Sequence, residues 1–231
     1  MARLWQISIS PEGWACDLLN PIAVIDFETT GMSPGQGARA TEVGIVLVEN
    51  GQVVDRFQSL MNTGVYIPGF ITQLTGITNA MVAAAPTAAQ VMADAARFVN
   101  GAPMVAHNAS FDSKFWQAEL ALAGVAAPHP FACTVLLSRR LYPQAPSHKL
   151  GNLVDYHHLP RTGRAHRALA DAEMAAALLG QIQHDLRQRW GVSQPDHALL
   201  VALQRCGKQG VGRFIERRVQ DQSPQRELEF V

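Results

Sequence analysis

The chain has 231 residues, of which 48% are hydrophobic and 16% are charged, so a packed globular protein is expected and a disordered chain is excluded. Its 19 basic residues balance its 19 acidic residues, and overall charge therefore provides no argument for nucleic-acid binding. Three widely spaced cysteines without zinc-site spacing, and a first segment without a secretory pattern, favour a cytoplasmic protein with reduced thiols. No apolar run reaches the roughly 20 residues of a membrane span, so no membrane association is expected.

The first strands are visible in the pattern of apolar residues. Residues 22–28 form an apolar run typical of a buried strand. Residues 41–50 and 52–62 alternate polar and apolar side chains and are separated by Asn50-Gly51, the strongest short hairpin signal. The sequence therefore predicts three early strands that include an antiparallel pair.

Helical and strand patterns alternate in the rest of the chain. We expect a helix over 87–99, a short buried strand over 103–107, a helix over 110–124 capped by Ser110 and closed by Gly124, a brief strand leading into a helix over 131–143, a helix over 147–158, a long helix over about 167–190, and one or two short helices within 195–220. Strands mixed with helices, with an antiparallel edge, indicate an α/β fold with three layers, α/β/α.

Basic residues are concentrated in two stretches of this neutral chain. Residues 139–167 carry six basic side chains against the single acid Asp155, and residues 205–218 carry five against Glu216. Such stretches could follow a phosphate backbone, although for either one alone a solvated helix face is the more ordinary interpretation. Lys149, in the first stretch, is a candidate substrate-binding residue.

Two carboxylates, Asp26 and Glu28, follow the apolar run of the first strand in the segment AVIDFETTG. Side chains two residues apart in a strand point to the same face, and two like charges there need a compensating cation. The segment HNASFD places Asp112 in the first turn of a helix that follows a strand, and HRALAD places Asp171 at the start of the last long helix. Sites in α/β proteins gather where strands end and helices begin, so these acids are expected to converge.

His166 lies five residues before Asp171, and five helical residues correspond to a rotation of roughly 140°, so both cannot share one helix face. His166 is therefore expected on the preceding loop, where a mobile imidazole suits proton transfer better than metal ligation. Four carboxylates form an oxygen-rich site of the kind that Mg²⁺ or Mn²⁺ prefers. They could hold two ions, typically about 3.5–4 Å apart, with Asp26 as the bridge.

The segments DFETTG, HNASFD and HRALAD, in this order, resemble the three motifs of the DnaQ-like 3′–5′ exonucleases, in the histidine (DEDDh) subgroup. YIPGFITQLTGIT, LLSRRLYP and SHKLGNL also resemble segments of the proofreading epsilon subunits of bacterial DNA polymerase III. The resemblance covers about residues 21–185. The resemblance implies a ribonuclease-H-like fold with a five-stranded mixed sheet. It also implies a catalytic site with His166 as general base and with metal ligands at Asp26, Glu28, Asp112 and Asp171. The chain around Thr29 and Thr30 would then cradle the 3′-terminal nucleotide, with Phe111 near the bases.

The tail contains QRELEF (residues 225–230), which resembles the peptide that binds bacterial sliding clamps. Leu228 and Phe230 would fill apolar pockets of the clamp, and Gln225 would anchor the peptide by hydrogen bonds. The ordinary alternative is a frayed terminus without a partner.

The predicted function is a metal-dependent 3′–5′ exonuclease that acts on single-stranded DNA ends, possesses a two-metal site and releases nucleoside 5′-monophosphates, in proofreading or repair. One alternative is an exoribonuclease that trims RNA ends or short oligoribonucleotides. A second is a noncatalytic nucleic-acid-binding module on the same fold. We expect an extension over residues 1–20, the exonuclease domain over 21–190, a helical extension over 191–220 and the tail over 221–231.

Overall fold

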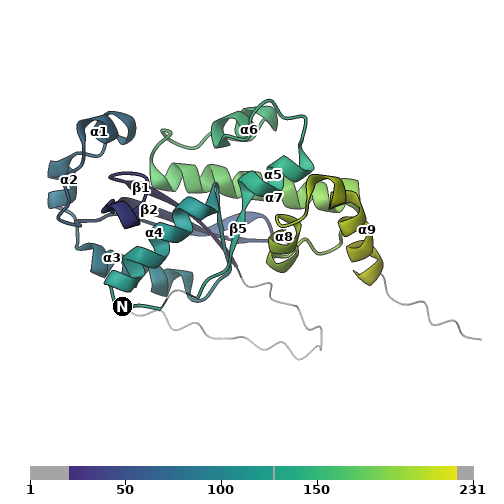
Figure 1. Ribbon diagram of the computed structural model, residues 1–231, viewed down its shortest axis with the longest axis horizontal. Helices are drawn as coiled ribbons and strands as arrows, with labels where there is room; N and C mark the ends of the chain where they lie inside the picture. Colours follow the sequence, from purple (N-terminus) through teal and green to yellow (C-terminus); the bar gives the residue numbers. More distant parts are fainter. Residues whose placement is uncertain (1–20, 127, 223–231) are drawn as a thin grey trace, which may run out of the picture.

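A five-stranded mixed sheet forms the centre of the molecule, for which a computed structural model describes residues 21–126 and 128–222 (Figure 1). The strands are β1 (Ile22–Thr29), β2 (Ala40–Glu49), β3 (Gln52–Leu60), β4 (Met104–Ala106) and β5 (Phe131–Cys133), in the order β3-β2-β1-β4-β5. β2 pairs antiparallel with β1 and β3, whereas β4 pairs parallel with β1 and β5. The mixed five-stranded sheet expected from the sequence is confirmed.

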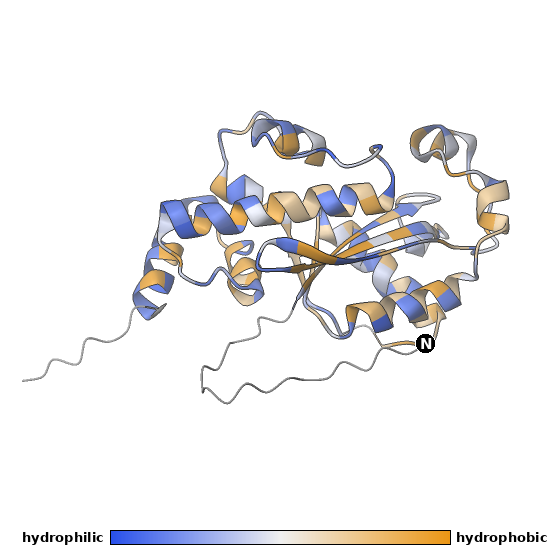
Figure 2. Cartoon of the chain, turned by 180° about the vertical axis from the view of Figure 1, so that it is seen from behind, coloured by the Kyte–Doolittle hydropathy of each residue, from blue (hydrophilic) through white to orange (hydrophobic). Residues whose placement is uncertain are grey.

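Helices cover both faces of the sheet and complete the three predicted layers. The long helix α7 (Ala168–Trp190) packs on the face that includes Val24, and α3 (Ala88–Val99) and α4 (Ala109–Leu122) pack on the face that includes Ile25. Neighbouring residues of β1 thus belong to different cores, as expected of alternating strand side chains. The central strands are largely hydrophobic (Figure 2).

The remaining elements surround these layers (Figure 1). They are η1 (Pro34–Gln36), α1 (Gly69–Thr75), α2 (Asn79–Ala83), α5 (Thr134–Leu141), α6 (Leu150–Tyr156), α8 (His197–Leu203), η2 (Lys208–Gly210) and α9 (Val211–Gln222). Among the helices of the described residues, none is both long enough and apolar enough to cross a bilayer.

Local signals located most elements, but one predicted cap is wrong. Asn50 and Gly51 form the β2–β3 turn with positive φ angles of 51° and 77°, as the hairpin pattern predicts. Ser110, however, does not cap α4. The N-cap is Asn108, in the left-handed conformation with φ of 73°, and Ser110 already lies within the first turn. Asparagine tolerates the left-handed conformation because its short side-chain amide can form hydrogen bonds with nearby backbone groups. This conformation allows the chain to turn sharply from β4 into α4.

Helix α7 lies directly against β2 because β2 has a glycine at the crossing point. A Cβ atom added at Gly44 would lie 2.2 Å from the Leu169 backbone nitrogen and 2.3 Å from the Ala168 carbonyl carbon. No side chain fits in that space, so the first turn of α7 packs on the bare β2 backbone. The glycine therefore sets how closely the start of α7 approaches the sheet.

The C-terminal helices pack against the β5 edge of the sheet. The Gln204 side chain, just after α8, accepts a hydrogen bond from the Cys133 backbone N–H at 2.6 Å and donates one to the Phe131 carbonyl at 3.1 Å. Val211 and Ile215 of α9 are buried in the core that also contains α7. The described part of the C-terminal extension thus shares that core, and the domain limits expected near residues 20, 190 and 220 stay predictions.

Candidate active site

The end of β1 places two carboxylates on the face covered by α7. Asp26 and Glu28 alternate with Phe27, which belongs to the opposite core. Asp26 is partly buried, and the Glu28 residue is only 8% exposed. Carboxylates in such surroundings lose most of their hydration, which is costly unless a positive charge replaces it.

The turn from β4 into α4 directs a third carboxylate toward β1. Asp112 lies in the first turn of α4 and is 1% exposed. Its Oδ1 accepts a hydrogen bond from the Phe27 backbone N–H at 3.2 Å. This bond joins the start of α4 to the strand that carries Asp26 and Glu28.

The start of α7 contributes Asp171 and the preceding loop contributes His166. Asp171 lies in the first turn of α7. His166 lies on the loop before α7, as its spacing predicts, with a positive φ of 60° and an exposed residue surface. Its backbone N–H donates to Asp171 Oδ2 at 2.9 Å, so the carboxylate also orients the loop.

These segments meet in one place. Potential ligand atoms of Glu28, His166 and Asp171 all lie within 4.8 Å of one another. Asp26 also lies within electrostatic reach of the other acids, because burial first, and then the charges of Asp112, Asp171 and Glu28, raise its pKa well above the ordinary value. We refer to Asp26, Glu28, Asp112 and Asp171 as the acidic cluster.

Burial is the main reason why the acidic cluster is electrostatically unfavourable on its own. It raises the pKa of Glu28 to about 8, assisted by the charges of Asp171 and Glu42. It also raises the pKa of Asp112 to about 8, although backbone N–H groups oppose the shift. The pKa of Asp171 is raised by burial against the opposing hydrogen bond from His166. Oxygen donors that share an excess of negative charge fit a hard divalent cation such as Mg²⁺ or Mn²⁺.

Glu42 supports this arrangement, although sequence reasoning did not single it out. It is fully buried on β2, and its carboxylate accepts hydrogen bonds from Arg167 at 2.7 and 3.1 Å and from the Ala168 backbone N–H at 3.0 Å. Arg167 directly follows His166 and is the N-cap residue of α7. The ion pair between Glu42 and Arg167 therefore attaches the segment that joins His166 to α7 to strand β2 of the sheet. No local signal reveals it, since the partners lie 125 residues apart.

The turn after β1 is held by the two threonines predicted to lie near the substrate. Thr29 Oγ1 donates to the Gly31 carbonyl at 2.7 Å, and Thr30 Oγ1 accepts from the Arg39 backbone N–H at 3.0 Å. The Arg39 side chain in turn forms an ion pair with buried Glu119 at 2.8 Å. Both threonine hydroxyls thus shape the turn beside the acidic cluster.

The other predicted substrate-binding residues lie around the starts of α4 and α6. Phe111 is partly buried, with its ring centroid 4.9 Å from that of Phe115. Lys149 is exposed and is the N-cap residue of α6. The clamp-motif residues Gln225, Leu228 and Phe230 lie outside the described residues.

Three basic side chains of the stretch 139–167 have partners within the protein, so only part of this stretch could follow a phosphate backbone. Arg161 pairs with Asp155, and Arg167 pairs with Glu42. Arg140 donates to backbone carbonyl groups of Leu136 and Cys206. These guanidinium groups satisfy local partners, and sequence spacing could not distinguish them from the exposed members of the stretch.

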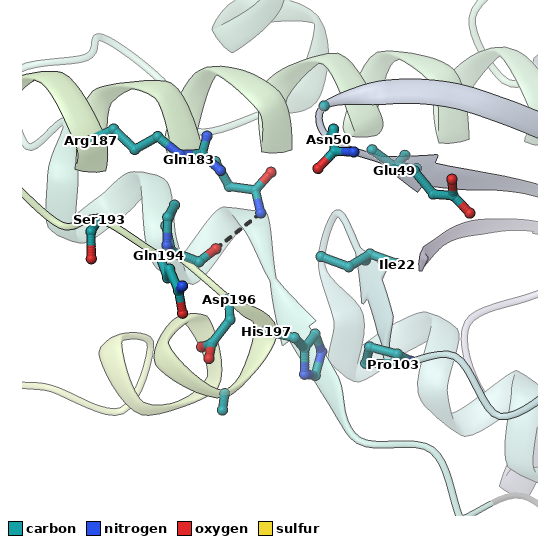
Figure 3. Close-up of a pocket in the computed structure, with 14 residues that line it drawn as sticks. Ile22, Glu49, Asn50, Pro103, Gln183, Arg187, Ser193, Gln194, Asp196 and His197 are labelled. Atoms are coloured by element: carbon teal, nitrogen blue, oxygen red, sulfur yellow. Dashed lines mark hydrogen bonds between the residues drawn. The ribbon is translucent and has the colours of Figure 1, made fainter. Parts of the chain in front are cut away.

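A cavity of about 390 Å³ contains no residue of the acidic cluster in its lining; Figure 3 shows the residues that line it. It is lined by Ile22 at the start of β1, by Gln183 and Arg187 of α7, and by the segment around His197. Of the acidic cluster, Glu28 lies near the other end of β1, roughly 20 Å along the strand from Ile22. Cavity size therefore does not identify the chemical site in this molecule.

The chain is similar to known proteins in sequence and in fold. Residues 23–179 match the sequence model of a family described as Exonuclease. The chain is 40% identical over 166 residues to the 3′-5′ exonuclease DinG of Bacillus subtilis, covering 71% of this chain and 18% of that protein. It is 31% identical over 170 residues to the DNA polymerase III subunit epsilon of Aquifex aeolicus, covering 73% of this chain and 83% of that protein. A structure of Exonuclease X in complex with 5′ overhanging duplex DNA superposes with a TM-score of 0.60 at 28% identity, covering 78% of this chain and 99% of that one.

Proposed function

Because the chain belongs to the DnaQ-like (DEDDh) family of 3′–5′ exonucleases, we propose that it hydrolyses the last phosphodiester bond at the 3′ end of single-stranded DNA and releases nucleoside 5′-monophosphates. The observation that carries this proposal is the meeting of Glu28, His166 and Asp171 in one acid-rich site next to Asp26 and Asp112. A loop histidine beside clustered carboxylates is suited to hydrolysis of a phosphodiester.

The acidic cluster would hold two divalent cations, Mg²⁺ or Mn²⁺. When bound, such ions neutralise developing charge on the phosphoryl group and make a water molecule more acidic. Asp112 and Glu28 can act as ligands only when deprotonated, and cation binding favours that state over the protonated one. The electrostatic repulsion among these carboxylates thus favours cation binding.

His166 would act as the general base. It takes a proton from the attacking water while a new P–O bond forms, and the bond from phosphorus to the 3′ oxygen of the preceding nucleotide breaks. That oxygen leaves with a proton from solvent, which completes the new 3′ hydroxyl. The hydrogen bond from the His166 backbone to Asp171 keeps the imidazole beside the cluster.

The proposed substrate-binding roles rest on the family resemblance. The rigid turn at Thr29 and Thr30 would support the terminal nucleotide through backbone groups, because both hydroxyls already have partners. Phe111 would contact the bases, and Lys149 would contact a phosphate. Stacking and phosphate contacts supply affinity without sequence preference, which suits an enzyme that degrades any single strand.

An exoribonuclease is the alternative substrate assignment, since phosphoryl-transfer chemistry does not depend on the 2′-hydroxyl. A noncatalytic binding module is a weaker alternative, because such a module would have no use for a repulsive buried cluster with a histidine beside it. End-labelled single-stranded DNA and RNA of the same sequence distinguish these three functions when each is incubated with the protein and Mg²⁺.

The decisive variant is Asp112→Ala, with Asp94→Ala as control, because Asp94 pairs with Arg97 on α3. We expect metal-dependent shortening of DNA from the 3′ end by the native protein and by the control, and none by Asp112→Ala. Faster degradation of RNA would transfer the assignment to the exoribonuclease. The nuclease proposal would be refuted if the native protein degraded neither DNA nor RNA, or if Asp112→Ala were as active as the native protein.

The relatives named as DNA polymerase III proteins support a role beside a DNA polymerase, in proofreading. Repair as the alternative role, a cytoplasmic location and a sliding clamp as partner are further proposals that rest on the sequence. The residues proposed to bind the clamp are Gln225, Leu228 and Phe230. Deleting residues 224–231 should abolish capture of the protein on immobilised clamp and leave the rate on free single strands unchanged. Equal capture of both proteins, or capture of neither, would reject the clamp assignment.

A further inference from the structure

Five exposed basic residues connect the acidic cluster with the C-terminal helix. They come from four elements far apart in the sequence, and we call them the basic track: Lys149, Arg139, Lys208, Arg213 and Arg217. None takes part in an ion pair among the described residues, whereas Arg140, Arg161 and Arg167 are bound internally. The track therefore carries positive charge that no ion pair of the described residues neutralises, although the acids Glu216 and Asp221 also lie on α9.

The track begins near the start of α4, the helix that carries Asp112 of the acidic cluster. His107 directly precedes Asn108, the N-cap of the helix that carries Asp112. The His107 Nε2 atom lies 3.1 Å from the carbonyl oxygen of His148, and Lys149 is the next residue. This contact holds the first lysine of the track close to the start of α4.

The middle of the track joins α5 to the C-terminal extension. Arg140 Nε donates to the Cys206 carbonyl at 3.0 Å, which holds α5 against the turn before Lys208. Arg139 and Lys208 both lie within electrostatic reach of His148, because their charges add to burial in lowering the pKa of its imidazole. Basic residues of two separate elements thus surround the loop that leads to Lys149.

The far end of the track is a shallow groove of about 270 Å³ on α9. It is lined by Arg213, Phe214, Arg217, Arg218, Gly210 and Asp221. The Arg218 guanidinium carbon lies 5.9 Å from the centre of the Phe214 ring. Val211 and Ile215 occupy the opposite, buried side of the helix, so packing requires apolar residues there but not the arginines. Basic side chains around an aromatic ring form a surface suited to a nucleic-acid strand.

The distance between the two ends can be judged from α7. This helix has 23 residues and is therefore roughly 34 Å long. Asp171 lies in its first turn, and α9 lies beside its other end in both views (Figures 1 and 2). A strand whose 3′ end lies in the acidic cluster must extend several nucleotides before it can contact the groove on α9.

We propose that the basic track binds the phosphodiester backbone of the strand upstream of its 3′ end, with α9 as the distal contact; this rests on the proposed function. The track would neutralise phosphates along the strand and raise affinity for long substrates over short ones. It assigns a role to the C-terminal extension, whose sequence resembles no part of the exonuclease motifs.

Two charge-removing variants test the distal contact. The test protein carries Arg213→Gln and Arg217→Gln, and the control carries Arg56→Gln and Arg97→Gln, which remove the same charge from β3 and α3. Degradation is measured on single strands of about 4 and about 16 nucleotides, a range that matches known single-strand sites. Binding is measured by fluorescence anisotropy at several salt concentrations.

We expect the test variant to raise KM and Kd for the long strand by about fivefold to tenfold and to lower the slope of log Kd against log salt by about 1.4. Its kcat and its KM for the short strand should equal those of the control. Equal weakening of binding to both strand lengths, or no change in binding to either, would overturn the proposal. Unchanged binding would leave the groove on α9 available for an acidic protein partner. Failure of the proposed function is distinguishable, because then the native protein would degrade neither strand.

Discussion

His166 and Asp171 form the smallest unit that explains the candidate chemistry. The Asp171 carboxylate accepts the His166 backbone N–H while its other oxygen remains available to a cation. One side chain can thus serve the metal site and position the base. The positive φ angle of His166 belongs to this arrangement, because this backbone conformation turns the loop back toward α7.

Replacing His166 by alanine should separate base catalysis from metal binding. We expect kcat to fall by about 10²–10⁴, the usual contribution of a general base, while KM for single strands changes little. Thermal stabilisation by Mg²⁺ should persist, because the acidic cluster is intact. Steady-state kinetics and thermal melts with and without Mg²⁺ would measure both, and a variant with native kcat would exclude His166 as the base.

At the scale of elements, the ion pair between Glu42 and Arg167 attaches the start of α7 to β2. Glu42→Gln should destabilise the protein by about 3 kcal/mol, because it leaves a partly buried guanidinium without its counter-charge. Activity should fall as well, since Arg167 adjoins His166. Arg56→Gln, which breaks an exposed pair with Glu173, should cost less than about 1 kcal/mol. Urea unfolding of both variants measures the difference, and equal values would contradict the anchoring role.

Contact between α7 and β2 depends equally on the absence of a side chain at Gly44. Gly44→Ala should destabilise the fold by about 3 kcal/mol and move Asp171, because the added methyl group meets helix backbone that cannot yield. Gly180→Ala is the matched control within α7, where the nearest atom to a new Cβ is 4.0 Å away. It should be neutral or stabilise by up to about 1 kcal/mol through helix propensity. Similar melting temperatures for both variants would refute the close-packing argument.

For the whole molecule, the acidic cluster links stability to pH and to cations. The folded pKa of Glu28 and of Asp112 is about 8, whereas unfolded carboxyl groups titrate near about 4. Between these values the folded chain binds more protons than the unfolded chain, so its stability falls as pH rises. In a chelator, the melting temperature should therefore decrease from about pH 5 to pH 8. Mg²⁺ should raise it more at pH 8 than at pH 5.

Asp112→Asn tests the source of this pH dependence. Its amide oxygen can still accept the Phe27 hydrogen bond, but the buried charge is gone. At pH 8 in a chelator we expect the variant to melt roughly 5 °C above the native protein, with a weaker pH dependence and little stabilisation by Mg²⁺. Calorimetry at several pH values checks this, and a variant less stable than the native protein under these conditions would contradict the electrostatic account.

Local sequence was sufficient for the strands, for most helices and for the acids at their ends. Period-two alternation, Asn50-Gly51 and the acidic motifs act within a few residues, so they can be read without the fold. The spacing of His166 and Asp171 even placed the histidine on a loop. Ser110 was mistaken for a cap because several residues near the start of α4 suit that role, and the left-handed turn at Asn108 decides between them.

Tertiary structure alone decided which charges face inward and which remain available. Arg167 and Lys149 belong to one basic stretch, yet one pairs with Glu42 and the other is exposed. The glycine contact at Gly44 and the cover of β5 by Gln204 likewise join segments distant along the chain. Such contacts depend on which elements the sheet brings together, and burial then changes the energy of every charge it encloses. The sequence by itself determined the local elements and the motifs, because both arise from neighbouring residues, whereas pairing and burial arise only when the chain has folded.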